Sequence, residues 1–226
     1  DIYTDGYPHD IQLAVGLPPA HYQSLCKKFK AYLMRPEIID FTHNGRTYSI
    51  EITDVQCFPQ AFAAAMTRYN TEMGKRATVI DLGGYTADYI QIVDGKPLIE
   101  HSDSLENGVI HLYHRIMQEI NCIMDTRLKE SDIDLIIRGN PHYPEQLIKI
   151  VDQQVRQYLD DFIGQLRERQ IDLRVGQTVI IGGGGILLRK YIEQNPWIQH
   201  ITFIDDIRAN AHGYQLMYET LRRKGG

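Results

Sequence analysis

Apolar positions along the chain fall into short continuous runs that alternate with stretches of helical spacing. Residues 11–15 form such a run, which ends at a G-L-P-P turn over residues 16–19. Residues 20–33 then carry apolar side chains three and four positions apart, which is the spacing of one helix face. The N-terminal part therefore predicts a strand, a turn and a helix.

The next segment predicts a β-hairpin followed by a helix. Asn44-Gly45 lies between two strand-like stretches, residues 38–42 and 47–53, and this dipeptide is the strongest short hairpin signal. An alanine-rich stretch follows over residues 59–68 and begins with proline, which the first turn of a helix tolerates well. We therefore expect a helix over these ten or so residues.

A meander of short strands is predicted around a glycine-rich turn. The strand-like residues 78–80 and 89–93 flank the turn at residues 81–88. An Asp-Gly-Lys turn at residues 94–96 then leads to another short strand over residues 97–100. The glycine-rich turn is thus expected at the ends of two neighbouring strands.

The remaining half of the chain predicts long helices and short apolar strands in alternation. Amphipathic helices are expected at residues 106–128 and 145–170. Apolar strands are expected at residues 133–137, 178–181 and 201–204. Further helices follow the last two strands, one ending near residue 193 and one starting at residue 207. This alternation indicates an α/β fold with helices on the faces of a sheet.

Composition and charge disfavour several classes of protein. Of the 226 residues, 43% are hydrophobic and 23% are charged, as in an ordinary globular protein. The formal net charge of -5 argues against direct binding of nucleic acid. Apolar runs fall short of the ~20 residues of a membrane span, and the N-terminus lacks signal-peptide features, so we expect a cytoplasmic protein without membrane contact. The three cysteines show neither disulfide nor zinc spacing.

The turn at residues 81–88 combines two carboxylates with two glycines. Asp81 stands at the end of a predicted strand, Gly83 and Gly84 follow it, and Asp88 comes seven residues after Asp81. Glycines let backbone amides approach phosphate oxygens closely, and successive amides in such a turn bind anions. A neighbouring carboxylate can hold Mg²⁺ through water. An ordinary Asp-Gly turn explains the motif about equally well, because glycine-rich turns are common.

A second glycine-rich element, the run Gly182, Gly183, Gly184 and Gly185, follows a predicted strand and opens a helix. Free amides and the helix dipole favour negative charge there, and the missing side chains admit a flat ligand. The run is not G-x-G-x-x-G, and the chain has no G-K-[ST], so dinucleotide and P-loop sites are disfavoured. Tight strand-helix packing requires one glycine rather than four, so the run favours a ligand.

The two glycine motifs, taken together and in this order, resemble those of the actin-like ATPase superfamily, most closely its ParM/StbA-type plasmid-segregation proteins. Residues 81–88 read D-L-G-G-Y-T-A-D and resemble the second phosphate motif, and residues 179–187 resemble the adenosine motif. Residues 15–18 resemble the end of a first-domain strand, residues 55–65 the connecting helix, and residues 210–213 the second interdomain connection. The resemblance covers nearly the whole chain.

The resemblance implies an actin-like, ribonuclease H-like nucleotide-binding domain, an α/β fold with a mixed sheet flanked by helices. Residues 1–56 are then a remnant of the first actin-like domain with its hairpin. Residues 57–226 are the second domain, which carries the connecting helix and both nucleotide motifs. The family also has an N-terminal D-x-G phosphate loop, for which this sequence shows no counterpart before Ile11. We therefore expect the chain by itself to bind nucleotide weakly and to hydrolyse it negligibly, because phosphoryl transfer needs charge stabilisation from both sides.

The same resemblance implies roles for individual residues. Gln60 matches the residue that positions the attacking water, and Asp81 is expected to act in catalysis and to hold Mg²⁺ through water, with Asp88 as a second Mg²⁺ carboxylate. The cofactor is ATP or GTP. Its binding residues are expected to be Gly83, Gly84, Tyr85, Thr86, Gly182, Gly183, Gly184 and Gly185.

The function implied by the resemblance is that of an ATPase that forms nucleotide-dependent filaments in plasmid segregation. Its partners are then further copies of itself and an adaptor protein bound to plasmid DNA. One alternative is a non-catalytic binding or structural lobe, which the missing phosphate loop favours. Another is a small-molecule kinase of the same superfamily, against which stands Gln60 in the water-positioning place.

Overall fold

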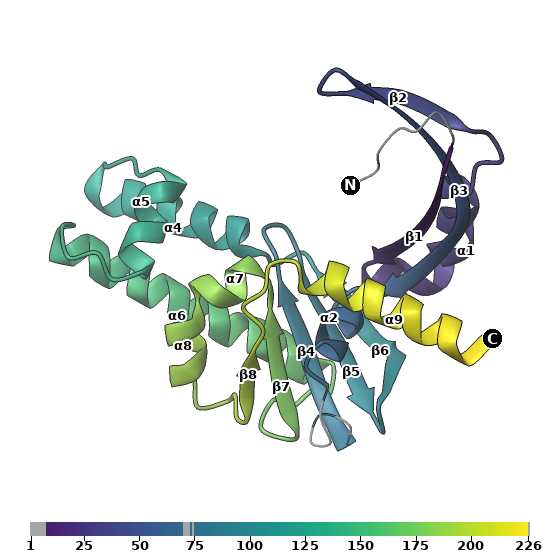
Figure 1. The fold of residues 1–226 in the computed structure, drawn as a ribbon. Coiled ribbons are helices and arrows are strands. Elements are labelled where there is room, and N and C mark those ends of the chain that lie inside the picture. The colour runs from purple at the N-terminus through teal and green to yellow at the C-terminus, as the bar shows by residue number, and fades with distance from the viewer. Residues whose placement is uncertain (1–7, 70–72, 74, 226) are drawn as a thin grey trace.

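The structure is a computed structural model that describes residues 8–69, 73 and 75–225, and in this part the chain folds around two β-sheets (Figure 1). The smaller sheet has the order β1-β3-β2 and consists of β1 (His9–Leu17), β2 (Ile39–His43) and β3 (Arg46–Pro59). β1 runs parallel to β3, and β2 runs antiparallel to it. Helix α1 (Pro19–Leu33) connects β1 to β2 and packs on this sheet.

The predicted hairpin is confirmed. Asn44 and Gly45 both have positive φ, 51° and 74°, which matches the right-handed twist of two strands joined by a two-residue turn. His43 and Arg46 are the last cross-strand pair before the turn. β3 continues much further than expected and reaches Pro59.

The larger sheet has five strands in the order β6-β5-β4-β7-β8. Its members are β4 (Arg76–Leu82), β5 (Ala87–Val93), β6 (Lys96–Leu105), β7 (Gln177–Ile181) and β8 (Ile201–Phe203). The first three strands form an antiparallel meander, while β7 and β8 run parallel to β4. The expected mixed sheet is therefore present.

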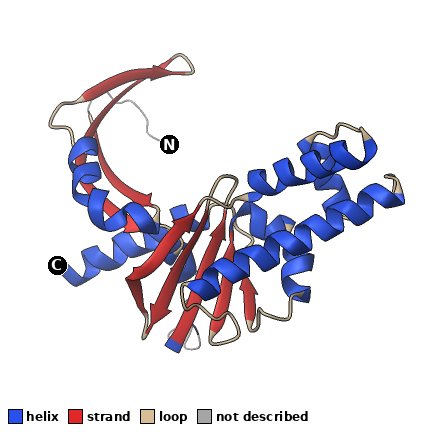
Figure 2. Cartoon of the chain, turned by 180° about the vertical axis from the view of Figure 1, so that it is seen from behind, coloured by secondary structure: helices blue, strands red, loops and turns tan. Residues whose placement is uncertain are grey.

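Helices cover both faces of this sheet (Figures 1 and 2). One face carries α4 (Val109–Met124), α6 (Glu145–Glu168), α7 (Gly182–Leu187) and α8 (Arg189–Gln194), and α5 (Glu130–Ile137) packs on α4 and α6. The other face carries α2 (Phe62–Met66) and α9 (Ala209–Gly225). Side chains alternate along each strand, so Ile80 and Leu82 enter the first core whereas Val79 enters the second. Among the described helices, none joins the length and the apolar character that a membrane crossing requires.

The strand expected at residues 133–137 is wrong, because these residues belong to helix α5. Ile133, Ile136 and Ile137 are buried at the three- and four-residue spacing of a helix face. The carboxylate of Asp132 accepts the Lys129 amide at 2.9 Å, which satisfies a donor at the start of the helix. An apolar run this short does not distinguish a strand from a buried helix.

The helix expected over residues 59–68 is largely wrong as well. Pro59 is the last residue of β3, opposite Leu17 of β1, and α2 contains only five residues. The interruption lies at Ala61, whose φ is 61° and which therefore cannot belong to a right-handed helix. The predicted domain boundary after residue 56 would fall within β3, and it stays a prediction.

Candidate functional site

The two glycine motifs lie next to each other in space. β4 and β7 are adjacent parallel strands, and Asp81 is the register partner of Ile181. The turn after β4 and the start of α7 after β7 therefore meet at one edge of the sheet. The two motifs from which a site was expected thus lie at the ends of neighbouring strands.

The two carboxylates of the first motif also face each other. Asp81 on β4 and Asp88 on β5 are direct antiparallel partners. Because side chains alternate along a strand, Asp81 points to the same face as Val79, and Asp88 to the same face as Ile90. This is the face that carries α2 and α9, so both carboxylates point toward the segment that contains Gln60.

Burial changes the acidity of both carboxyl groups. It raises the pKa of Asp81, and this rise is opposed by a hydrogen bond of 2.9 Å from Asn210 Nδ2 to Asp81 Oδ2. The pKa of Asp88 is also raised, first by burial, since the residue is only 5% exposed, and further by the charge of Asp81; Ser104 opposes the rise. Within the described part of the chain, Asp88 Oδ1 is buried and has no hydrogen-bond partner. A cation between the two groups would relieve both penalties.

These carboxylates suit Mg²⁺, which binds one or two carboxylates and takes its remaining ligands from water and phosphate. A cluster of three or more His, Cys, Asp or Glu side chains around one point does not occur among the described residues. The chain therefore offers the carboxylate pair, Asp81 and Asp88, rather than a complete protein cage.

The turn between β4 and β5 presents its amides outward. The amides of Gly108, Val109 and Ile110 at the start of α4 donate to the carbonyl groups of residues 83–85, at 2.9–3.1 Å. These three bonds fix the turn with its carbonyl groups toward α4. The amides of residues 84–86, by contrast, donate to no group in the described part of the protein. Tyr85 is 81% exposed and does not cover them. The turn therefore leaves three successive amides free to bind an anion.

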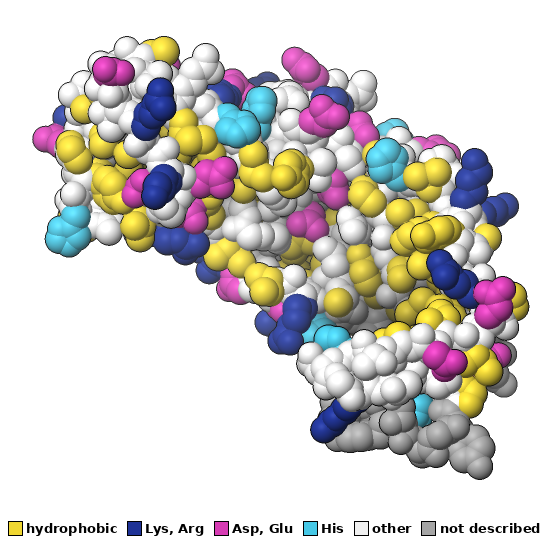
Figure 3. All heavy atoms as spheres, turned by 90° about the horizontal axis from the view of Figure 1, so that it is seen from above, with side chains coloured by type: hydrophobic (Ala, Val, Ile, Leu, Met, Phe, Trp, Pro, Cys, Tyr) yellow, Lys and Arg dark blue, Asp and Glu magenta, His cyan; other side chains and the backbone are white. Residues whose placement is uncertain are grey.

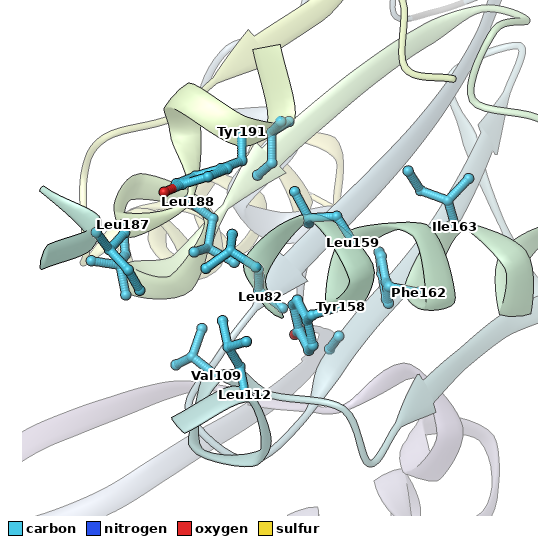
Figure 4. Close-up of a cluster of buried hydrophobic side chains, with 14 of the residues drawn as sticks. Leu82, Val109, Leu112, Tyr158, Leu159, Phe162, Ile163, Leu187, Leu188 and Tyr191 are labelled. Carbon is cyan, nitrogen blue, oxygen red and sulfur yellow. The ribbon is translucent and has the colours of Figure 1, made fainter. Parts of the chain in front are cut away.

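Three of the four consecutive glycines have a packing role, which corrects the interpretation that the run exceeds packing needs. A Cβ on Gly182, whose φ is +87°, would lie 2.5 Å from Asp81 Oδ1. A Cβ on Gly184 would lie 2.8 Å from Leu82 and from Val109, and one on Gly185 would lie 2.5 Å from Ile180. Figure 4 shows the cluster of buried side chains, with Leu82 and Val109, on which α7 packs.

Gly183 differs from its neighbours. A Cβ at this position would meet no described atom within 4 Å, and its φ is not in the left-handed region. Packing therefore does not require glycine here. Gly183 is exposed and directly follows Gly182, the glycine whose Cβ would lie 2.5 Å from Asp81 Oδ1.

Gln60 lies between the two sheets, immediately after β3. Its backbone amide donates to Leu17 O at 2.9 Å, at the end of β1. The next amide, that of Ala61, donates to Asn210 Oδ1 at 2.9 Å. Because the same Asn210 side chain also donates to Asp81, one side-chain amide links the residue after Gln60 to Asp81.

Tyr214 on α9 also reaches this region. Burial raises its pKa well above the ordinary value, and the charges of Asp81 and Asp88 raise it further, whereas a hydrogen bond with Gln60 lowers it. Its ring packs so closely on Gly16 that a Cβ there would lie 2.0 Å from the Tyr214 hydroxyl. Gly16 thus makes room for the tyrosine at the junction of the sheets.

Sequence reasoning missed Asn210 and Tyr214 as site residues. An asparagine near the start of a helix is ordinarily read as part of the helix end, and a tyrosine on a helix as packing. The G-L-P-P turn held one signal for Tyr214. Its first residue, Gly16, is a glycine at a strand end, which indicates that another group approaches the backbone closely. The identity of that group follows only from the tertiary structure.

Comparison with known proteins agrees with this architecture. Residues 2–62 match the family model described as the N-terminal domain of actin-like proteins. Residues 79–194 match the model of the archaeal actin homologue, MreB-like, C-terminal domain. A search of curated proteins finds no match.

Solved structures with this fold share little sequence identity with the chain. The archaeal actin homologue Ta0583 has a TM-score of 0.76 and 22% identity, over 95% of this chain and 71% of that chain. It has also been solved in complex with ADP, at a TM-score of 0.68, with 20% identity over 93% of this chain and 72% of that chain. The Alp12 filament structure has a TM-score of 0.71 and 17% identity, over 96% and 70%. Bacillus thuringiensis ParM with ATP has a TM-score of 0.62 and 14% identity, over 94% and 69%.

These similarities confirm the actin-like fold. The order of the five-stranded sheet, the glycine motifs at its edge and the two family matches all agree with it. Since the C-terminal family model covers just over half of the chain, the protein belongs to the actin-like family of archaeal MreB-like actin homologues.

Proposed function

We propose that this protein binds ATP with Mg²⁺ at the edge of the five-stranded sheet and that hydrolysis there controls its self-assembly. The observation that carries the proposal is the set of free amides of residues 84–86 after β4, together with the exposed Gly183 after the neighbouring strand β7. Both features lie at the ends of adjacent parallel strands, where α/β sheets bind nucleotides.

Each part of the site has a role in the proposed chemistry. The amides of residues 84–86 bind phosphate oxygens, and the surface at Gly183 accepts the base or ribose. Asp81 and Asp88 hold the Mg²⁺, which neutralises charge on the phosphates. Gln60 orients the attacking water. Structures of similar proteins with ADP and with ATP support the choice of nucleotide.

Assembly into filaments is part of the proposal, and plasmid segregation with a DNA-bound adaptor is its most specific form. The Alp12 filament structure supports self-association. On the face seen in Figure 3, acidic and basic side chains are interspersed, which favours contacts with protein over a broad nucleic-acid surface. We expect any contact with DNA to be made by the adaptor.

Calorimetric titration tests nucleotide binding. ATP, ADP and GTP are titrated into the full-length protein with and without Mg²⁺, and the parent is compared with Gly183→Val and Gly164→Val. A Cβ on Gly164 of α6 would likewise meet no described atom within 4 Å, so its variant is a matched control away from the site. We expect Gly183→Val to abolish binding and Gly164→Val to retain it. Equal binding by all three proteins contradicts the proposed site.

A further inference from the structure

The segment that carries Gln60 has a strained backbone. The amide of Phe62 donates to Gln60 O at 2.6 Å, and the residue between them, Ala61, has φ 61° and ψ -53°. This is a γ-turn with positive φ at its middle residue, the rarer and more strained of the two kinds. A non-glycine residue keeps such a conformation only where its surroundings hold it, and such strain concentrates at functional sites.

Asn210 is the side chain that holds this turn. Ala61 is fully buried, and its amide donates to Asn210 Oδ1 at 2.9 Å, so the strained residue has its polar group satisfied from α9. Asn210 Nδ2 donates to Asp81 Oδ2, also at 2.9 Å. Only one orientation of the amide satisfies both partners, since an N–H needs an oxygen and a carboxylate needs a donor.

The two hydrogen bonds of Asn210, one from the Ala61 amide and one to Asp81, form a bridge between two parts of the site that come from different sheets. This bridge fixes the distance between them. Gln60 follows the last strand residue of the smaller sheet, and Asp81 lies near the end of the central strand of the larger one. The Gln60 amide is bound to Leu17 O, so its position follows the end of β1 as well. A shift of Asn210 would therefore move the Gln60 turn relative to Asp81 without touching the phosphate-binding amides.

We propose that Asn210 is a positioning residue for hydrolysis, which keeps Gln60 and Asp81 in the arrangement that the attacking water requires. This inference rests on the proposed ATPase function. It assigns Asn210 no contact with the nucleotide. Loss of the bridge should therefore slow turnover and leave nucleotide affinity nearly unchanged, because alignment acts in the transition state.

Two substitutions of Asn210 separate the effects of its two hydrogen bonds, to the Ala61 amide and to Asp81. Asn210→Ala removes both hydrogen bonds. Asn210→Asp keeps an oxygen for the Ala61 amide but places a carboxylate against Asp81. Gln60→Ala is the reference for loss of water positioning. Gln215→Ala, which removes a side chain bonded to Glu219 on the solvent-facing side of α9, is the control.

ATP affinity and phosphate release are measured for each variant of the full-length protein, with amide exchange at Ala61 as a check on the turn. We expect both Asn210 variants to lose roughly 10- to 100-fold in turnover, as Gln60→Ala does, with ATP affinity within about threefold of the parent. Exchange at Ala61 should accelerate in Asn210→Ala and stay slow in Asn210→Asp. The control should match the parent.

The possible failures are distinguishable. A parent that does not bind or hydrolyse ATP refutes the proposed function, and the inference with it. A parent that hydrolyses ATP while the Asn210 variants keep its turnover refutes the inference only. The same holds if affinity falls in parallel with turnover, because Asn210 would then serve the fold rather than the alignment.

Discussion

At the scale of single residues, the four consecutive glycines are not equivalent, although the sequence makes them look so. Gly184 is enclosed by Leu82 and Val109, whereas the space at Gly183 is open. Sequence reasoning located this glycine run correctly at the end of a strand, because the run directly follows the apolar residues 178–181. It could not assign the individual glycines, because their neighbours come from β4 and α4.

This difference gives opposite predictions for two alanine substitutions. Gly184→Ala should lower stability by about 1–3 kcal/mol, because its Cβ would lie 2.8 Å from Leu82 and from Val109. Gly183→Ala should raise stability by up to about 1 kcal/mol, because alanine restricts the unfolded chain and meets no clash. Denaturant unfolding of both variants measures the difference. Equal effects of the two substitutions would contradict the assignment.

The ionised carboxylate of Asp88 is predicted to lower the free energy of unfolding at neutral pH. Burial raises its folded-state pKa, so the folded protein holds this proton more tightly than the unfolded chain does. The contribution of the protonated Asp88 carboxyl group to the free energy of unfolding is fully present below the pKa that this group has in the unfolded chain. It is lost as the pH rises through the pKa that the group has in the folded protein. Asp88→Asn should therefore melt at a higher temperature than the parent at pH 7, and this advantage should shrink toward pH 4.

Thermal melting across that pH range provides the measurement. Asp10→Asn, at an exposed position on β1, is the control for removal of a carboxylate charge. Magnesium nucleotide should reduce the advantage of Asp88→Asn, because a bound cation stabilises the carboxylate form. An advantage that is constant with pH would show that burial of the charge is not its cause.

At the scale of elements, short apolar runs and helical spacing identified most strands and long helices, and local signals identified the hairpin. The errors fell where tertiary contacts override local pattern. Residues 133–137 are apolar enough for a strand but belong to α5, which packs against α6. The helix after β3 was overestimated because Ala61 is held at positive φ by Asn210, 149 residues away along the chain.

The crossing of α2 and α9 depends on one glycine. A Cβ on Gly213 would lie 1.9 Å from the Ala63 carbonyl oxygen, so the two helices meet backbone to backbone. Gly213→Ala should separate them and lower the free energy of unfolding by about 1–3 kcal/mol. Gly164→Ala, also within a helix but with no described atom within 4 Å, should be neutral or slightly stabilising.

Hydrogen exchange localises the effect of Gly213→Ala. Protection should fall in α2 and α9 and remain unchanged in the β2–β3 hairpin, which lies away from this crossing (Figure 1). A uniform loss of protection over the whole chain, or a loss equal to that of Gly164→Ala, would show that the crossing is not a local determinant of stability.

At the scale of the whole molecule, α9 connects the two sheets. It packs on the larger sheet through Ala209 and contacts the smaller one through Tyr218, whose hydroxyl donates to Asp54 Oδ2 at 2.8 Å. Arg222 Nη1 donates to Gln12 at 2.9 Å on β1. Gln60 and Asn210 lie at this junction. We therefore expect a ligand bound at the end of β4 to change the angle between the two sheets.

Nucleotide should consequently control assembly rather than merely bind. A contact between copies that involves both sheets forms only when the angle between them suits it, and ATP shifts the population toward the state that it binds better. We expect ATP with Mg²⁺ to increase sedimentation and light scattering of the full-length protein in a concentration-dependent manner, and ADP to increase them less. Gly183→Val should lose this response, whereas Gly164→Val should keep it. Assembly that proceeds equally without nucleotide, or equally in Gly183→Val, would show that the site and the assembly surface are not coupled.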